Sequence, residues 1–201
     1  MSFYSKAKFF LAGLVRKLWR IRVEGKENER PGVSYLICAN HQSMLDPVLL
    51  GAAIQHNPKY MAKAELLKVP LVGSLVKALG AYPIDRGGSD VAAIKKTIAL
   101  LKEGESVIMF PQGTRHKRID PKTTKVKFGC AMIAARAEVP VLPVYIDVKD
   151  HYVRLFRKTV IRIGKEISPE ELKAVSEGPE DHRHGAELIF SRILAMEEKA
   201  E

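Results

Sequence analysis

The sequence predicts one α/β domain with a mostly parallel central sheet flanked by helices. Short apolar runs alternate along the chain with longer segments of helical periodicity, and this alternation is typical of such sheets. The 201 residues, 46% of them hydrophobic, suffice for one full-sized core. Polar residues suited to chemistry follow several of the apolar runs. Loops after parallel strands gather at one edge of a sheet, so we expect these residues to meet there.

The expected strands are short, apolar and bounded by turn residues. They span 20–25, 33–39, 60–64, 81–85, 106–110, 139–146 and 160–163. The expected helices after residue 22 span 47–55, 70–80, 129–137 and 186–196, with a further helix from a Ser89 cap to a stop at Gly104. Cys38 and Cys130 are too few for a disulfide framework and are expected to be packing residues in a reducing compartment. No Cys or His cluster has zinc-ligand spacing, so no metal is expected.

Residues 1–22 are expected to form an amphipathic helix ahead of a domain spanning 23–201. The segment carries six Lys or Arg and no acid, and its apolar run at residues 9–15 is too short to cross a membrane. It has no small-residue cleavage site, which argues against a signal peptide. We expect contact with an anionic membrane surface through Phe3, Phe10, Leu14, Trp19 and Lys17. The alternative is a helix packed on the core with its lysines in water.

The net charge of +10 is concentrated in two segments. Besides the first 22 residues, the loop 116–127 holds five basic residues against one acid, and the rest of the chain is neutral. Two local patches indicate a negatively charged surface as partner. No nucleic-acid motif or stacking cluster is present, so nucleic acid is not an expected partner.

A histidine and an aspartate stand five positions apart after the run 33–39, in the stretch from Asn40 to Asp46. A carboxylate beside a histidine fixes its tautomer and favours the imidazolium, so His41 is a candidate general base. Such a pair without a serine or cysteine nucleophile suits a reaction whose substrate supplies the nucleophile. Because Asp46 precedes Pro47, we expect a turn, with Asp46 as the N-cap, that folds the imidazole back toward the carboxylate. The plain alternative is a cap and an unrelated loop histidine.

Two glycine-containing turns follow strands and carry guanidinium groups. Arg86 begins an Arg-Gly-Gly-Ser turn, and residues 110–115 read Phe-Pro-Gln-Gly-Thr-Arg. Glycines let backbone amides approach an anion, and arginine offers a two-pronged donor to phosphate. Each turn alone is compatible with solvated structure. Together with the candidate base they predict a site for a phosphorylated nucleophile.

Four ordered blocks of this chain resemble the glycerolipid acyltransferases, with the closest likeness to bacterial lysophosphatidic acid acyltransferases. The blocks are Asn40-His41-x-Ser43-x-x-Asp46, residues 84–86, residues 110–115 and residues 139–146, and the likeness covers roughly residues 20 to 165. It implies transfer of an acyl group from coenzyme A or acyl-carrier protein to the sn-2 hydroxyl of lysophosphatidic acid. The product would be phosphatidic acid, and neither a covalent acyl-enzyme nor a cofactor or metal would be needed.

The resemblance also implies roles. His41 would be the base, and Asp46 would orient it. The enzyme would act at the cytoplasmic face of the cell membrane. The residues that would bind the phosphate or glycerol are Arg86, Gln112, Gly113, Thr114 and Arg115. Those that would line the acyl site are Val139, Pro140 and Pro143, although packing of a buried strand explains the run 139–146 equally well. Gln112 departs from the family, which usually has glutamate there, so its role in acceptor preference is in question.

Two other functions remain open at this level. One is an acyltransferase for another acceptor, such as glycerol-3-phosphate or a lysophospholipid. The other is a non-catalytic basic protein that binds membrane or nucleic acid, which the charge alone would permit. The sequence leaves undecided the acyl chain length, the donor and the oligomeric state.

Overall fold

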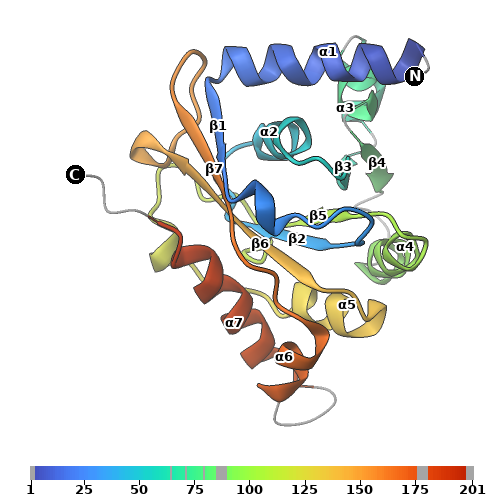
Figure 1. The fold of residues 1–201 in the computed structure, drawn as a ribbon, viewed down its shortest axis with the longest axis vertical. Coiled ribbons are helices and arrows are strands. Elements are labelled where there is room, and N and C mark those ends of the chain that lie inside the picture. The colour runs from blue at the N-terminus through green and yellow to red at the C-terminus, as the bar shows by residue number, and fades with distance from the viewer. Residues whose placement is uncertain are drawn as a thin grey trace.

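The computed structural model describes residues 3–63, 65–70, 72–78, 80–84, 90–175 and 181–197. The described residues form one seven-stranded sheet in the order β1-β7-β6-β2-β5-β3-β4 (Figure 1). The strands are β1 (Ile21–Glu24), β2 (Leu36–Ala39), β3 (Lys59–Lys63), β4 (Ala81–Ile84), β5 (Val107–Met109), β6 (Val141–Val148) and β7 (Thr159–Ile163). All neighbouring pairs are parallel except β6 and β7.

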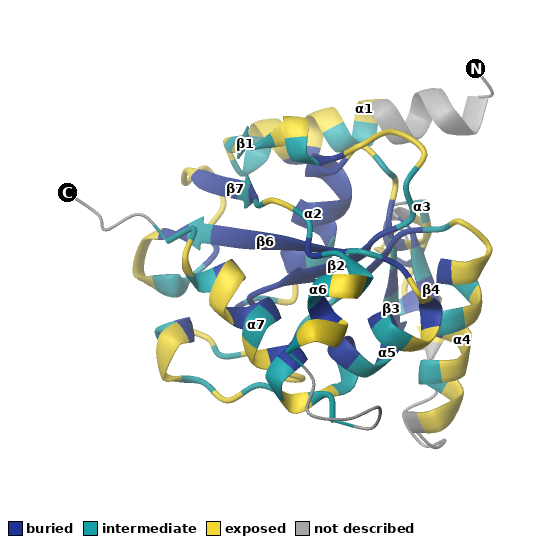
Figure 2. Ribbon diagram, turned by 60° about the horizontal axis from the view of Figure 1, so that its bottom comes forward, coloured by how far each residue is buried: buried dark blue, intermediate teal, exposed yellow. Residues whose placement is uncertain are grey.

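Helices cover both faces of the sheet. The helices are α1 (Phe3–Leu18), α2 (Asp46–Ala53), α3 (Val72–Ala78), α4 (Asp90–Lys102), α5 (Gly129–Ala137), α6 (Pro169–Ala174) and α7 (Arg183–Leu194). Short 3-10 turns are η1 (Lys26–Asn28), η2 (Leu66–Lys68), η3 (Pro121–Thr123) and η4 (Lys149–His151). Helices α1 to α3 pack on one face and α4 to α7 on the other, which leaves the central strands buried (Figure 2).

Strand β2 shows how the sequence builds two cores at once. Successive side chains of a strand point to opposite faces. Leu36 and Cys38 therefore join the core beneath α5 and α7, while Ile37 and Ala39 join the core beneath α1 and α2. A strand apolar at every position is the pattern of a sheet buried on both faces. Both cysteines are free and buried, in agreement with a packing role.

The crossovers follow one hand. The chain moves from β2 through β3 to β4 with α2 and α3 on one face, and returns from β4 through β5 to β6 with α4 and α5 on the other. Parallel strands connected by helices are nearly always right-handed crossovers, so a reversal of direction along the sheet forces a change of face. This reversal determines where the site lies.

The predicted fold class is confirmed, with local differences. Strand β7 runs antiparallel to β6, because the ten-residue connection between them is too short for a parallel crossover. Strand β2 begins at Leu36 rather than at 33, and β6 spans 141–148 rather than 139–146. Helix α6 was not predicted, although Ser168 caps it by accepting from the backbone N–H of Glu171, which is the Ser-x-x-Glu signal for a helix start.

The N-terminal helix divides its apolar residues between the core and the surface. Val15 is buried and Leu11 packs against the core, whereas Phe10 is 75% exposed and Leu14 43% exposed. Arg16 donates from its guanidinium to the carbonyls of Ala52 and Ala53 at the C-terminal end of α2, where carbonyls lack helical partners.

Two of the expected membrane-contact residues of this segment need separate mention. Trp19, expected at the exposed edge of the helix, packs against the core, and its indole Nε1 is buried. The side chain of Phe3 lies outside the described part of the structure. Within the described residues, no helix combines the length and hydropathy needed to cross a bilayer.

Candidate active site

The candidate site lies where two neighbouring strands send the chain to opposite faces of the sheet. Strands β2 and β5 are adjacent and parallel, but β2 leads to α2 on one face and β5 leads to α5 on the other. Such a divergence opens a crevice beyond the carboxyl ends of the two strands, where ligands bind in open α/β sheets. His41 follows β2 and the segment 110–115 follows β5, so both predicted motifs meet at this crevice.

The turn that carries His41 is fixed to the neighbouring strand β6. The side chain of Asn40 accepts from the backbone N–H of Ile146 at 2.7 Å and donates to its carbonyl at 3.1 Å. Gln42 donates to the same carbonyl at 2.6 Å. Both amides are buried, so these hydrogen bonds form in a low dielectric and hold the backbone on each side of His41.

Asp46 organises the turn through one oxygen. Its Oδ2 accepts from the backbone N–H groups of Gln42 and Ser43, both at 2.7 Å, and lies 2.8 Å from Nδ1 of His41. The predicted contact between ring and carboxylate is therefore present. The predicted N-cap is wrong, because α2 begins at Asp46 itself and the cap residue is Leu45. The carboxylate bends back over the turn instead of forward over the helix.

These contacts fix which ring nitrogen of His41 is available. Asp46 is fully buried and its carboxylate accepts, so Nδ1 carries the proton and Nε2 carries the lone pair. The His41 side chain is 15% exposed. Its Nε2 has no hydrogen-bond partner among the described residues and is not one of the buried unpartnered atoms, so it opens to the crevice. This arrangement suits a general base.

The loop after β5 supports the ring from its other side. Phe110 stacks on the imidazole, with ring centroids 3.9 Å apart and planes 14° from parallel. The side-chain oxygen of Gln112 accepts from the backbone N–H of His41 at 2.6 Å, and the N–H of His116 donates to the His41 carbonyl at 2.9 Å. The stacking and the Gln112 contact could not be read from the sequence, because neither follows from spacing.

Gln112 was expected to bind substrate, but the structure places its carboxamide inside the protein. The residue is 3% exposed, and its Nε2 donates to the Thr124 hydroxyl, which in turn donates to the carbonyl of Pro121. Thr124 had no signal in the sequence.

Gly113, Thr114 and Arg115 are exposed at the mouth of the crevice. Gly113 has a φ of 69°, and a Cβ there would lie 2.7 Å from Cδ of Lys127, so the tight turn favours glycine. Thr114 and Arg115 line a pocket of about 560 Å³ together with residues 42–45, Lys117 and Tyr152. Arg115 forms no ion pair with any described residue, so its guanidinium is available to an anion beside the His41 turn.

Of the remaining predicted site residues, one lies outside the described residues and three lie away from His41. Arg86 and its turn lie outside the described residues. Val139 and Pro140 precede β6, at the edge of the sheet opposite His41, and Pro143 lies inside the sheet opposite Cys38. An apolar pocket of about 440 Å³ lies behind Phe110, between α4 and α5, and its lining includes none of these three residues.

One group of side chains outside the crevice has metal-ligand chemistry. Asp120, His151 and Glu197 bring one ligand atom each to within 4.8 Å of one another. However, the ammonium of Lys122 lies 2.5 Å from a carboxylate oxygen of Glu197, and the Tyr145 hydroxyl donates to the other oxygen at 2.7 Å. A cation already neutralises this carboxylate, so the group is poorly suited to a metal ion.

Comparisons with known proteins show which family this chain belongs to. Residues 20–147 match the family model described as acyltransferase. The chain is 32% identical over 184 residues to the 1-acyl-sn-glycerol-3-phosphate acyltransferase of Bacillus subtilis, covering 89% of each protein. It is 39% identical over 166 residues to the enzyme of the same name from Streptococcus pneumoniae, covering 80% of this chain and 58% of that protein.

A solved structure shows the same fold. The 1-acyl-sn-glycerophosphate (LPA) acyltransferase of Thermotoga maritima superposes with a TM-score of 0.70 at 27% identity, over 100% of this chain and 86% of that one. The family match spans both halves of the crevice, from before β1 to the end of β6. This chain belongs to the acyltransferase family.

Proposed function

We propose that this protein transfers a fatty acyl group from an acyl thioester to the sn-2 hydroxyl of lysophosphatidic acid, giving phosphatidic acid. The observation that carries the proposal is the His41–Asp46 pair, whose Nε2 has no partner among the described residues. Arg115, which forms no ion pair with a described residue, lines a pocket with the turn residues 42–45 that follow His41. The names of the relatives from Bacillus subtilis and Streptococcus pneumoniae support the choice of lysophosphatidic acid.

The proposed reaction needs one proton transfer in each direction. Nε2 of His41 takes the proton of the acceptor hydroxyl while the oxygen attacks the thioester carbonyl. The tetrahedral intermediate collapses, the C–S bond breaks, and the imidazolium returns the proton to the leaving thiolate. Asp46 holds the tautomer and stabilises the imidazolium, because its Oδ2 accepts from Nδ1 throughout. The substrate oxygen is the nucleophile, so no acyl-enzyme forms.

The crevice offers separate regions for the two ends of the substrates. Thr114 and Arg115 would bind the acceptor phosphate. The proposal also assigns Arg86, which lies outside the described residues, to phosphate binding. Gly113 would let the loop approach the glycerol, while Gln112 would act by holding the backbone of His41. The apolar pocket behind Phe110 would take an acyl chain, with Met61, Ile94 and Ile133 in its wall. No cofactor enters this scheme, and the thioester belongs to coenzyme A or acyl-carrier protein.

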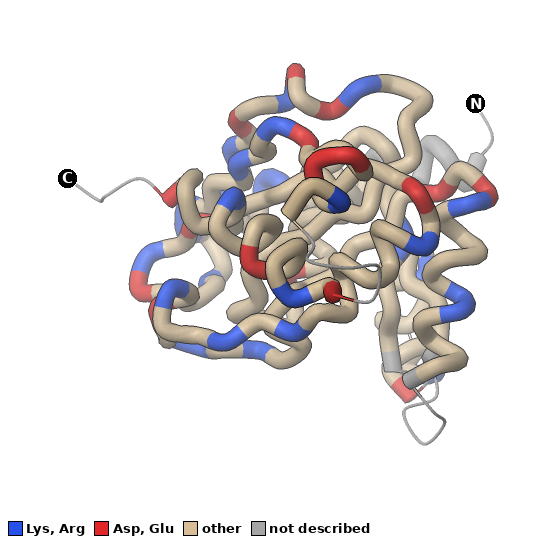
Figure 3. The backbone as a smooth tube through the Cα atoms, turned by 90° about the horizontal axis from the view of Figure 1, so that it is seen from below, with Lys and Arg blue, Asp and Glu red and all other residues tan. Residues whose placement is uncertain are grey.

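We place the protein on the cytoplasmic side of the cell membrane as a peripheral or monotopic protein. Phe10 and Leu14 are exposed on α1 and Lys17 is exposed beside them, so this face fits an anionic lipid surface. Figure 3 shows further Lys and Arg segments along the loop that precedes α5, which would face the same lipids or an acidic carrier protein.

A substrate panel tests the proposal. Lysophosphatidic acid, glycerol-3-phosphate and a neutral monoacylglycerol are each paired with acyl-coenzyme A and acyl-carrier protein donors of graded chain length, and products are identified by mass. We expect phosphatidic acid from lysophosphatidic acid, and loss of turnover with retained vesicle binding in His41→Ala. Thioester consumption that requires another acceptor, or equal turnover in the variant, would refute the proposal.

A further inference from the structure

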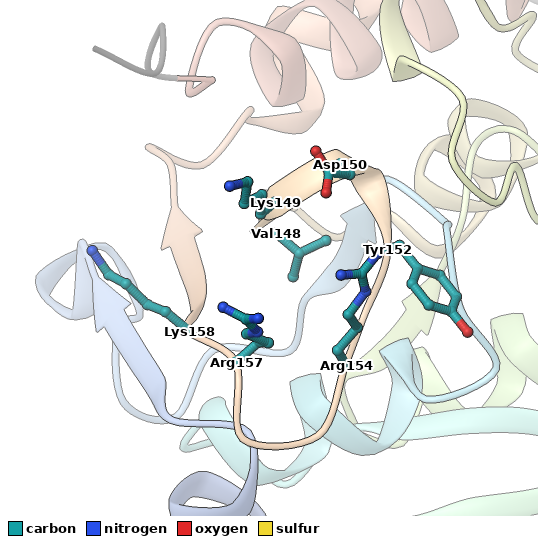
Figure 4. Close-up of a pocket in the computed structure, with 7 residues that line it drawn as sticks. All are labelled: Val148, Lys149, Asp150, Tyr152, Arg154, Arg157 and Lys158. Atoms are coloured by element: carbon teal, nitrogen blue, oxygen red, sulfur yellow. The ribbon is translucent and has the colours of Figure 1, made fainter.

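The connection between β6 and β7, residues 149–158, forms a small basic pocket at one end of the molecule. The pocket has a volume of about 90 Å³, and its lining includes Lys149, Arg154, Arg157 and Lys158 against the single carboxylate of Asp150. In Figure 4 the side chains of Arg154 and Arg157 reach into the space that the loop encloses, whereas Lys158 extends away from its centre. We call residues 149–158 the β6–β7 loop.

The two arginines of this loop that reach into the pocket lack a carboxylate partner in the described part of the chain. Among the described residues, neither Arg154 nor Arg157 forms an ion pair. In the same hairpin, by contrast, Arg162 of β7 forms hydrogen bonds to the carboxylates of both Glu24 and Asp147.

Further cations gather beside the pocket. The ring of Tyr152 lies under the cationic groups of Lys117, Arg118 and Arg154, at 4.6, 4.8 and 5.3 Å from its centroid. Like charges brought together in this way repel one another, so the cluster is suited to an anion.

The tip of the loop combines exposure with an unfavourable backbone. Leu155 is 49% exposed and Phe156 63% exposed. Phe156 has a φ of 60°, a left-handed conformation that favours glycine or asparagine and disfavours a bulky residue. An aromatic residue at this position gains nothing from burial in the protein and is disfavoured by the backbone conformation. Transfer of the Phe156 ring into an apolar medium would explain why it is there.

The tip of the loop lies at the C-terminal end of α1. The backbone N–H of Phe156 donates to the carbonyl of Leu18 at 2.8 Å, and Figure 1 shows the tip beside the C-terminal end of α1. Leu14, which is 43% exposed, stands four residues, about one helical turn, before Leu18.

We propose that the β6–β7 loop is a second lipid-binding element, which docks on an anionic phospholipid surface. Leu155 and Phe156 enter the boundary between headgroups and acyl chains, while Arg154 and Arg157 bind the phosphate of one headgroup from two sides. An apolar tip flanked by cations matches the layering of such a surface, with the apolar region beneath the phosphates. This inference goes beyond the proposed reaction and holds whether or not the crevice acylates lysophosphatidic acid.

The experiment measures partition of the full chain onto sucrose-loaded vesicles of phosphatidylglycerol and phosphatidylcholine, and onto vesicles of phosphatidylcholine alone. Leu155→Ser with Phe156→Asn should lower binding to the anionic vesicles about tenfold or more, since two buried side chains are lost. Asparagine fits the left-handed backbone, so this variant should fold at least as stably as the parent. Val91→Ser, which removes a 54% exposed apolar residue from α4, is the matched control and should bind as the wild type does.

A second set of variants tests the role of charge. It compares two pairs of substitutions that lower the net charge by the same amount. Arg154→Ala with Arg157→Ala should lower anionic binding about tenfold at low salt and abolish most of the preference over phosphatidylcholine. Lys95→Ala with Lys102→Ala, on exposed positions of α4, should have a much smaller effect. Arg154→Lys with Arg157→Lys should recover only part of the loss, because lysine lacks the planar fork.

Three results would overturn the inference. The first is that the tip variant binds anionic vesicles as the wild type does. The others are that the two alanine pairs lower vesicle binding equally, or that the lysine pair binds the vesicles as strongly as the wild type. Circular dichroism, thermal unfolding and turnover of a short-chain lysophosphatidic acid in free solution show that each variant is folded. The same turnover assay in wild type tests the proposed reaction separately from lipid binding.

Discussion

The two ends of the region around β2 each carry a histidine that holds a buried carboxylate through Nδ1. At the carboxyl end, His41 contacts Asp46 at 2.8 Å, with side-chain exposures of 15% and 0%. At the amino end, beside Tyr35, His56 contacts Glu29 at 2.6 Å, with exposures of 14% and 1%. By distance, burial and chemistry the two pairs are nearly the same.

Their second ring nitrogens differ. Nε2 of His56 is buried and has no partner among the described residues, whereas Nε2 of His41 opens to the crevice. The His56 and Tyr35 rings meet edge to face, with centroids 5.5 Å apart, while the His41 ring stacks on Phe110. The residues that follow His41, 42–45, line a pocket together with Arg115. A buried His–carboxylate pair is therefore not sufficient for a catalytic site. Access to the second nitrogen and a place for the substrate distinguish the two.

Alanine in place of each histidine should give the largest effect and separate the pairs most clearly. His41→Ala removes the proposed base, so kcat/KM should fall about 10²- to 10⁴-fold. Buried Asp46 keeps the N–H groups of Gln42 and Ser43, so the free energy of unfolding should fall by no more than in His56→Ala. His56→Ala leaves buried Glu29 without its ring partner, so the free energy of unfolding should fall by about 1–3 kcal/mol while kcat/KM stays within about threefold. Steady-state kinetics and chemical denaturation of both variants check this. Equal losses of activity would show that the comparison is mistaken.

Isosteric amides at the two carboxylates should give the next largest effect. Asp46→Asn keeps an acceptor for the N–H groups of Gln42 and Ser43 but removes the charge that stabilises the imidazolium, so kcat should fall about 100-fold. Glu29→Gln should leave kcat near that of the wild type, because His56 does not reach the crevice. A pH–rate profile adds a second readout, since a positioning role for Asp46 shifts the apparent base titration and a structural role does not. An unchanged profile and kcat in Asp46→Asn would remove Asp46 from the mechanism.

The arginine nearest each pair provides a third test. Arg115 has no ion-pair partner among the residues that the structure describes, whereas Arg30, beside Tyr35, is bound by Glu166 through two hydrogen bonds. Arg115→Ala should raise the KM for lysophosphatidic acid about tenfold, because the variant loses its contact with the phosphate. The KM for a neutral monoacylglycerol, which has no phosphate, should not change. Arg30→Ala should change the KM for neither acceptor. An equal rise for both acceptors would place Arg115 away from the phosphate.

The sequence predicted the sheet and the meeting of the motifs because both follow from local patterns. Apolar runs and turn residues located each strand of the parallel block to within a few residues, and the parallel order placed His41 and Arg115 at one edge. The direction of β7 follows from the length of its connection to β6. Helix α6 was missed although its capping signal was present.

Contacts between residues on separate elements of the fold could not be predicted from the sequence. The stacking of Phe110, the path from Gln112 to Thr124, and the turning inward of Trp19 depend on how separate elements pack. The same limit applies to the acyl site. A run such as 139–146 is apolar because its strand is buried on both faces, so composition alone cannot distinguish a strand of the core from the wall of a substrate pocket.

The smallest expected effect concerns the one departure from the family pattern. Gln112 accepts from the backbone N–H of His41 and donates to Thr124, whose hydroxyl then donates to Pro121. In Gln112→Glu the carboxylate still accepts from His41, and the Thr124 hydroxyl can rotate to donate to it. The acceptor KM should therefore change less than about twofold, since the side chain does not point at substrate.

Gln112→Leu is the matched comparison for that variant. It removes the acceptor altogether, leaves the buried N–H of His41 unsatisfied and should lower both kcat and stability, the latter by about 1–3 kcal/mol. Kinetics with lysophosphatidic acid and unfolding curves for both variants decide between two roles. A large change of acceptor KM in Gln112→Glu, with kcat preserved, would mean that this residue contacts the substrate. The small effect would mean that glutamine and glutamate serve here as alternative acceptors for the same backbone N–H. At the other pair the carboxylate of Glu29 itself accepts from the backbone N–H of His56, at 2.8 Å, so there a single side chain holds both the ring and the backbone.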